Sequence, residues 1–257
     1  MLVLSPYKYI MKYPFLKDNE LILVDFLPGS SGQLLMRLWS ELDNRLNYNN
    51  ENIITDLSIH SHLATREIDY GIEVPKRITN WFLDKCDPKE VTDYLNFFEF
   101  LSTFILSTTQ RWNWNDKVST RFYEDYNYQM KDYRILYGIH TWHKRIPFKE
   151  MQDLGYNIKC ISVVADTVVG RKFQQERCQV CYPQSDKFWK NILPVFNNKN
   201  LEGTERFDFC TLLATKDSAK IVEWLANKLG NEFREDKVKR VNEILDVYYA
   251  EIIDKLN

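Results

Sequence analysis

The chain has 257 residues, of which 44% are hydrophobic and 27% are charged, so it is ordinary for a globular protein and long enough for one large core. A formal net charge of −2 gives no basic footprint for nucleic acid, and only eight glycines and eight prolines argue against disorder. No stretch reaches the roughly 18–20 apolar residues that span a bilayer. Five cysteines, an odd number, fit a reducing compartment, and we expect a cytoplasmic protein without a membrane span.

The first predicted elements are a strand and a helix that flank a short loop. Residues 21–27 form a nearly continuous apolar run broken only by Asp25, which is typical of a parallel strand buried on both faces. After the loop, apolar residues recur at helical spacing at Leu34, Leu35, Leu38, Trp39 and Leu42. This pattern predicts a strand, a tight loop and an amphipathic helix.

The middle of the chain predicts two helices and a second strand. Residues 87–90 (DPKE) make a good helix start, with a capping carboxylate and a proline in the first turn, and the helix is expected to reach about residue 108. Residues 134–139 (RILYGI) predict the second strand. Pro147 to Leu154 predict a short helix that Gly155 ends.

Strands and helices alternate in the rest of the chain. The expected strands are 158–164 and 206–213, and the expected helices run from Asp166 or Thr167 toward Cys178 and over about 184–194, 216–229 and 235–256.

This alternation predicts an α/β protein with a three-layer sandwich around a mostly parallel central sheet. The whole chain, 1–257, is expected to be a single domain. Within it we expect a helical insertion around 60–130 and a C-terminal helix around 235–256.

The loop between the first strand and helix has the composition of an anion-binding turn. Gly29 and Gly32 allow close ligand approach, and Ser30 and Ser31 offer hydroxyl groups next to a helix start, where unpaired N–H groups gather. The loop has no lysine, so the signature of nucleotide triphosphatases is incomplete. An ordinary strand-to-helix turn remains an alternative.

Four segments in the same order along the chain resemble the sulfotransferase superfamily. LPGSSGQLL at 27–35 resembles its phosphosulfate loop, and RILYGIHTW at 134–142 resembles a strand that ends in a histidine near the acceptor. KCISVVADTVVGRKF at 159–173 resembles the strand leading to the 3′-phosphate motif, and residues 207–230 resemble a late strand–loop–helix.

The resemblance implies a P-loop nucleotide-transferase-like fold and a reaction. The implied donor is 3′-phosphoadenylyl sulfate, the implied acceptor is a small molecule or protein with a hydroxyl or amine, and no metal is expected. The residues implied to bind the donor are Gly29, Ser30, Ser31, Gly32, Gln33, Arg37, Arg171 and Lys172.

Several positions depart from the family pattern. Ser30 stands where a basic residue is usual, Gln33 where a threonine or serine is usual, and Ala165 where an arginine is usual. Arg37, Arg171 and Lys172 could supply the missing charge, or they could lie on solvated helix faces.

His140 is the candidate general base. It follows a predicted strand at its carboxyl end, where open α/β sheets bind ligands, and its ordinary pKa lies near neutral pH. His143 is the second choice, and a purely structural histidine is the alternative. Asp25 is interpreted as a local structural group that could also face the same crevice.

A zinc site is a rival interpretation of some of these residues. His140 with His143, and Cys178 with Cys181, have the spacing of paired zinc ligands, but the separation between the pairs is not diagnostic. Two unrelated thiols are the alternative.

Two other functions compete with sulfuryl transfer. A protein that has the fold but lost the donor site would be a binding or interaction module. A small-molecule kinase is a third hypothesis, which the missing loop lysine argues against.

Overall fold

The computed structural model describes residues 15–27, 31–42, 90–99, 134–139, 146–181, 186–229 and 235–256. Gly29, Ser30, His140 and His143 lie outside these ranges, as does most of the predicted insertion at 60–130. Gln33 and Cys181 lie in described helices, but their side chains are outside the description.

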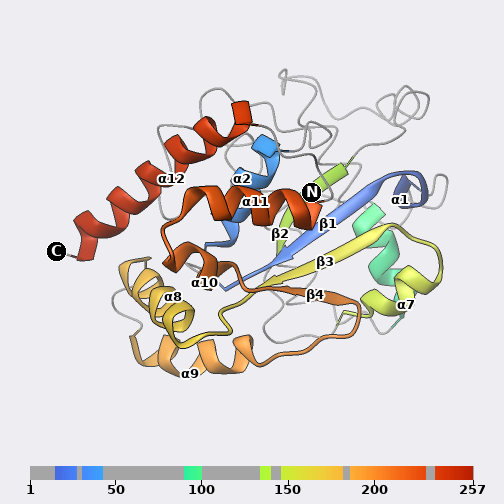
Figure 1. The fold of residues 1–257 in the computed structure, drawn as a ribbon. Helices are drawn as coiled ribbons and strands as arrows, with labels where there is room; N and C mark the ends of the chain where they lie inside the picture. The colour runs from blue at the N-terminus through green and yellow to red at the C-terminus, as the bar shows by residue number, and fades with distance from the viewer. Residues whose placement is uncertain are drawn as a thin grey trace, which may run out of the picture.

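A four-stranded, all-parallel sheet forms the centre of the fold (Figure 1). Its strands are β1 (Glu20–Asp25), β2 (Arg134–Ile139), β3 (Ile158–Val163) and β4 (Thr204–Phe207), in the order β2-β1-β3-β4. β1 is buried along nearly its whole length because neighbouring strands and helices cover both its edges and its faces. The prediction of an α/β fold with a parallel sheet is confirmed.

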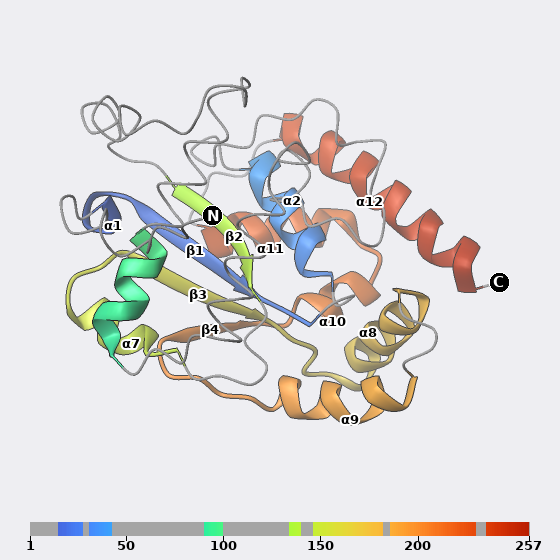
Figure 2. The same cartoon turned by 180° about the vertical axis from the view of Figure 1, so that it is seen from behind.

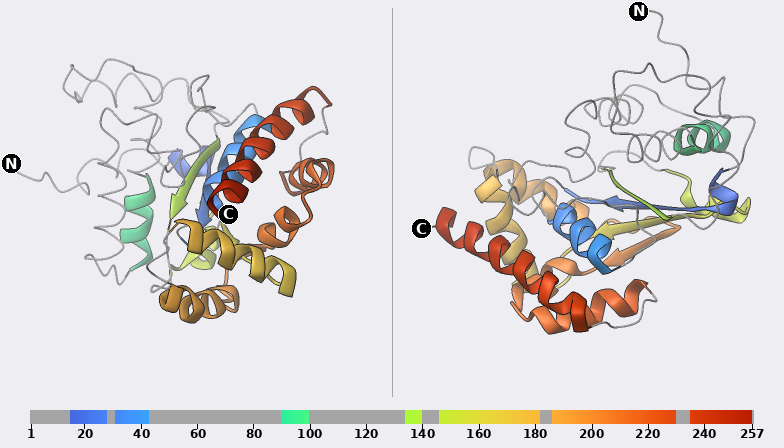
Figure 3. Two further views of the ribbon diagram at one scale, coloured as in Figure 1. Left: turned by 90° about the vertical axis from the view of Figure 1, so that its left-hand side faces the viewer. Right: turned by 90° about the horizontal axis from the view of Figure 1, so that it is seen from above.

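Among the described residues, four helices pack on one face of the sheet. They are α2 (Gly32–Leu42), α10 (Phe209–Ala214), α11 (Ser218–Leu229) and α12 (Glu235–Leu256). Ile22 and Val24 of β1 point into this layer, where they join apolar side chains of all four helices in the larger core cluster. Figures 2 and 3 show α2 and α12 side by side on this face.

Leu21 and Leu23 of β1 point into the opposite layer, because alternate residues of a strand face opposite sides. This layer contains α1 (Phe15–Asp18), the helical residues 91–99 and α7 (Phe148–Asp153). The helix at 91–99 lies within the one predicted to start near residue 87. α7 ends at Asp153, one residue before the predicted end at Leu154, and Gly155 follows with a φ of 82°, which suits glycine.

α8 (Val168–Cys181) and α9 (Asp186–Asn197) follow β3 and lead to β4. A small apolar cluster joins them to the residues after β1 and β3: Leu27, Val164, Cys178, Leu193 and Phe196. The two helices thus lie beyond the carboxyl ends of the central strands (Figure 1).

The predicted strand at 206–213 is wrong beyond Phe207. β4 ends there, and Phe209–Ala214 form α10. Phe209, Cys210 and Leu213 all face the core, which is the spacing of one helical face rather than of a strand. A short apolar run does not distinguish the two periods.

In the ranges that the structure describes, no helix combines the length and the apolar character needed to cross a membrane.

Candidate functional site

The connections of the sheet change direction between β1 and β3. The chain leaves β1 toward β2 on one side, whereas β3 lies on the other side of β1 and leads on to β4. In open α/β sheets, ligands bind outside the carboxyl ends of the strands at such a point. The residues that follow Asp25 and Val163 therefore form the candidate site.

Ser31 begins the helix that follows β1. Its carbonyl oxygen accepts a hydrogen bond from the Leu35 N–H at 3.0 Å, and its φ is 67°, in the left-handed region that side chains rarely adopt. A left-handed backbone is thus found at a serine, directly before Gly32. Such strain is typical of functional sites, although it does not identify the function.

Gly32 is small because Phe26 needs the space. A Cβ atom on Gly32 would lie 2.0 Å from the nearest atom of the Phe26 ring, which is far inside van der Waals contact. The ring of Phe26, the residue after β1, therefore packs directly on the first residue of α2. Gly32 does not have a left-handed φ, so the contact with Phe26 is the structural reason for a glycine at this position.

The Ser31 hydroxyl contacts Tyr248, and Arg177 contacts the same tyrosine hydroxyl. The Oη of Tyr248, in α12, lies 2.5 Å from Ser31 Oγ, and Arg177 Nε of α8 donates to the same Oη at 3.0 Å. All three residues are buried. Burial raises the pKa of Tyr248 to about 12, although the positive charge of Arg177 and both hydrogen bonds oppose the shift.

Arg37 lies in the interior of the protein rather than on the solvated helix face that was its alternative. It sits in α2, within two turns of Ser31. A buried guanidinium always carries charge and must have polar or anionic neighbours, so Arg37 remains a candidate for binding the donor.

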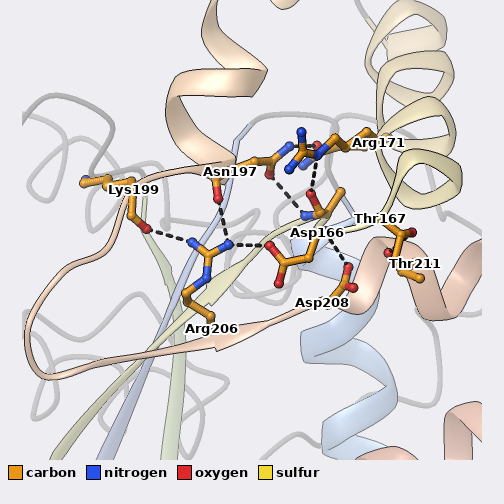
Figure 4. A network of polar contacts seen from close by, with 10 residues as sticks. Asp166, Thr167, Arg171, Asn197, Lys199, Arg206, Asp208 and Thr211 are labelled. Atoms are coloured by element: carbon orange, nitrogen blue, oxygen red, sulfur yellow. Dashed lines mark hydrogen bonds and ion pairs between the residues drawn. The ribbon is translucent and has the colours of Figure 1, made fainter.

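Side chains from several elements hold the backbone after β3 in place (Figure 4). Asn197 Oδ1 accepts a hydrogen bond from the Ala165 N–H at 3.1 Å, and Asp208 Oδ1 accepts one from the Asp166 N–H at 3.0 Å. Thr167 Oγ1 accepts from the Gly170 N–H at 3.1 Å and thereby caps α8. Of the two predicted helix starts, Thr167 provides the cap.

The two basic residues at 171–172 point in different directions. Arg171 Nε donates to the Ala165 carbonyl at 3.2 Å, so its side chain folds back over the end of β3 (Figure 4). The side chain of Lys172 is 78% exposed, and its Nζ lies 3.8 Å from Glu176 Oε1, one helical turn later. Arg171 therefore lies at the candidate site, whereas Lys172 forms a solvent-exposed ion pair.

Arg206 of β4 links the segment that follows β3 to the segment that follows α9. Its Nη1 donates to the Lys199 carbonyl at 2.8 Å, and its Nη2 donates to the Asn197 carbonyl at 2.7 Å and to the Asp166 carboxylate (Figure 4). Only a planar guanidinium presents donors in this fork.

We expect Arg206→Lys to lower the free energy of unfolding by about 1–2 kcal/mol, because an ammonium group cannot reach all three acceptors. The urea midpoint measures this loss. The matched control is Lys220→Ala, which breaks the exposed pair with Asp217 and is expected to change stability by less than about 0.5 kcal/mol. Equal effects of the two variants would show that Arg206 is no more than a surface charge.

The same network continues onto the face of the sheet opposite to α2 and α12. Asp25, Ser162 and Arg206 are neighbours in register across β1, β3 and β4, so they share one face. Burial lowers the pKa of Lys199, and Asp25 opposes this shift, so the two charges interact. Burial and then Asp25 raise the pKa of the Cys160 thiol well above its usual value, which makes it a poor nucleophile.

The rival zinc site gains one structural fact. Cys178 is a buried cysteine that packs among apolar side chains, including Val164 and Phe196. Its proposed partners, His140 and His143, lie outside the described residues. Among the described residues, no group of three or more histidine, cysteine or acidic side chains is arranged to hold a metal.

The sequence did not identify Arg177, Asn197, Arg206 or Tyr248 as site residues. Tyr248 fits the apolar register of α12, and Arg177 follows another charged residue, Glu176, in a helix. Their partners are distant in sequence: 217 residues separate Ser31 from Tyr248. No local motif marks such residues.

Comparisons with known proteins return nothing for this chain: no family model, no curated protein and no solved structure matches it. The function must therefore be argued from the residues themselves.

Proposed function

We propose that the protein is a sulfotransferase-like enzyme that uses 3′-phosphoadenylyl sulfate as its donor. The adjacency of β1 and β3, whose register pairs Asp25 with Ser162, carries this proposal. The segments that resemble the phosphosulfate loop and the 3′-phosphate motif follow these two neighbouring strands. A nucleotide with phosphates at its 5′ and 3′ positions could then contact both segments at one edge of the sheet.

Polar and cationic groups at this edge suit an anionic donor. α2 begins at Gly32, so its first unpaired N–H groups and its dipole face the residues after β1. Arg171 lies over the end of β3, where it is proposed to replace the arginine that the family has at position 165. Arg37 and Arg177 add buried positive charge behind the loop.

The proposed reaction is an in-line displacement at sulfur. An acceptor oxygen or nitrogen forms a bond to sulfur, the bond from sulfur to the phosphate oxygen breaks, and adenosine 3′,5′-bisphosphate leaves with the electron pair. His140 is proposed to take the acceptor's proton. It directly follows Ile139, whose register neighbour is Asp25 at the end of β1.

Nucleotide binding is tested by calorimetry with adenosine 3′,5′-bisphosphate. We expect a Kd below about 1 mM, which corresponds to about −4 kcal/mol, and weaker binding of adenosine 5′-monophosphate, which lacks the 3′-phosphate. Arg171→Ala should weaken binding of the bisphosphate more than binding of the monophosphate. Lys220→Ala is the surface control. No detectable heat at millimolar bisphosphate would rule out this donor.

A binding module without activity is the second candidate. It is favoured by the exposed position of Lys172 and by Ala165, which together leave fewer cations at the site than the family pattern has. Release of adenosine 3′,5′-bisphosphate from the donor, measured with a panel of hydroxyl and amine acceptors, separates the two candidates. Turnover that is lost in a Ser31→Ala, His140→Ala double variant would exclude the module.

A further inference from the structure

Ser31, Tyr248 and Arg177 form a buried chain of hydrogen bonds that has one donor too many. The three residues are 8%, 2% and 6% exposed, and they come from the start of α2, from α12 and from α8. The chain contains three donor hydrogens, on Arg177 Nε, Tyr248 Oη and Ser31 Oγ. Two contacts join the three residues, so only two of these hydrogens are paired within the chain.

Only the first step of this chain has a fixed direction. Arg177 Nε can only donate, so it occupies a lone pair of Tyr248 Oη. The phenol keeps its own hydrogen at neutral pH because burial raises its pKa to about 12. Within the described residues, Ser31 Oγ is the hydrogen-bond acceptor within reach of that hydrogen, at 2.5 Å. Either hydroxyl of this pair could donate to the other. When Tyr248 donates to Ser31, the phenol hydrogen is paired and the Ser31 hydrogen is the one left over.

The hydrogen of Ser31 is then left without an acceptor in the described part of the chain. Ser31 Oγ has Tyr248 as its recorded partner, and in this direction that contact uses Oγ as an acceptor. A buried hydroxyl hydrogen without a partner is unfavourable, so the site is complete only when an acceptor arrives. The left-handed backbone of Ser31 keeps this hydroxyl at the junction of loop and helix.

We propose that Arg177 and Tyr248 are positioning residues that turn the Ser31 hydroxyl into a donor for an anionic oxygen of phosphate or sulfate. A chain that begins at a permanent positive charge and runs in one direction polarises each of its hydroxyl groups, which strengthens the final donor. The α2 dipole acts in the same direction. The identity of the nucleotide rests on the proposed function, whereas the preference for an oxyanion rests on the chain.

The test measures affinity by calorimetry for two probes, adenosine 3′,5′-bisphosphate and inorganic sulfate. Ser31→Gly removes the donor and also suits a φ of 67°, so the backbone at this position is not strained by the change. We expect this variant to bind both probes about tenfold more weakly. Tyr248→Phe keeps the ring and breaks the chain, and we expect a weakening of about three- to tenfold.

Tyr249→Phe is the matched control. It removes a tyrosine hydroxyl from the next position of α12, one that donates to the Leu213 carbonyl at 2.8 Å. A merely structural role of Tyr248 would make both Tyr→Phe variants alike, with lower melting temperatures and unchanged affinity. The inference requires that only Tyr248→Phe weakens binding.

The outcomes separate this inference from the proposed function. Binding of sulfate but not of the bisphosphate, with the same pattern of variants, would support the donor chain and reject the nucleotide. If Ser31→Gly or Tyr248→Phe binds as tightly as the unaltered protein, or if the unaltered protein binds neither probe at millimolar concentration, the inference is overturned.

Discussion

Replacement of Trp39 by alanine is expected to lower the free energy of unfolding by about 3–5 kcal/mol. Trp39 is one of the largest fully buried side chains, and its ring stacks on Phe207 with 5.9 Å between the ring centroids. Trp39 belongs to α2, and Phe207 ends β4. Their contact therefore anchors the helix that follows the candidate loop to the edge strand. Urea denaturation followed by circular dichroism measures the loss.

Trp39→Phe is the informative comparison. In the described part of the chain the indole Nε1 is buried without a hydrogen-bond partner, and phenylalanine removes this donor while keeping an aromatic ring. Removing the unpaired donor partly offsets the destabilisation caused by the smaller ring. We therefore expect the free energy of unfolding to fall by less than about 1.5 kcal/mol. Similar losses for the alanine and phenylalanine variants would show that the stacking on Phe207 contributes little. Val168→Ala, at an exposed position, should leave stability unchanged within about 0.5 kcal/mol.

The sequence predicted the elements that have strong local patterns. β1 and β3 are runs of apolar residues at the centre of the sheet, where both faces are covered. Their composition therefore predicts their burial. α11 and α12 have apolar residues at helical spacing and a glycine, Gly230, between them. Such patterns depend on the element itself rather than on its neighbours.

The edge of the sheet was harder to predict for a physical reason. β4 is only partly buried, so it lacks the continuous apolar run of a central strand. The apolar residues after it belong to α10, and a turn at Asp208 separates the two elements. The sequence shows one apolar run, whereas the structure divides it where the Asp208 carboxylate accepts the Asp166 N–H.

The candidate site was predictable only in part. Ser31 and Gly32 are marked by the small-residue loop, but the strain at Ser31 and the contact of Gly32 with Phe26 arise from packing. In the sequence, Arg37 fits the polar side of an amphipathic helix, whereas in the structure its side chain is buried. Tyr248 of α12 reaches Ser31, and Arg177 of α8 reaches Tyr248, through tertiary packing. A single sequence carries no local sign of such contacts.

Gly170→Ala is expected to destabilise the protein by about 2–3 kcal/mol, although alanine favours a helix by about 1 kcal/mol over glycine. A Cβ at Gly170 would lie 2.1 Å from Thr211 Oγ1 and 2.8 Å from the Thr211 N and Cα atoms. The side chain could rotate away, but the backbone of α10 could not, so α8 would have to move. Because α8 carries Arg177, this shift should also weaken binding of the bisphosphate in calorimetry.

Gly155→Ala is the control that separates crowding from backbone strain. Gly155 has a φ of 82°, and a Cβ there would meet no atom within 4 Å, so only strain of about 1–2 kcal/mol is expected, with no effect on anion affinity. Urea midpoints of the two variants give the comparison. A Gly170→Ala protein that is more stable than the unaltered one would mean that helix propensity outweighs the contact with Thr211. In that case the close packing of α8 on α10 would not be what positions Arg177 beside Tyr248.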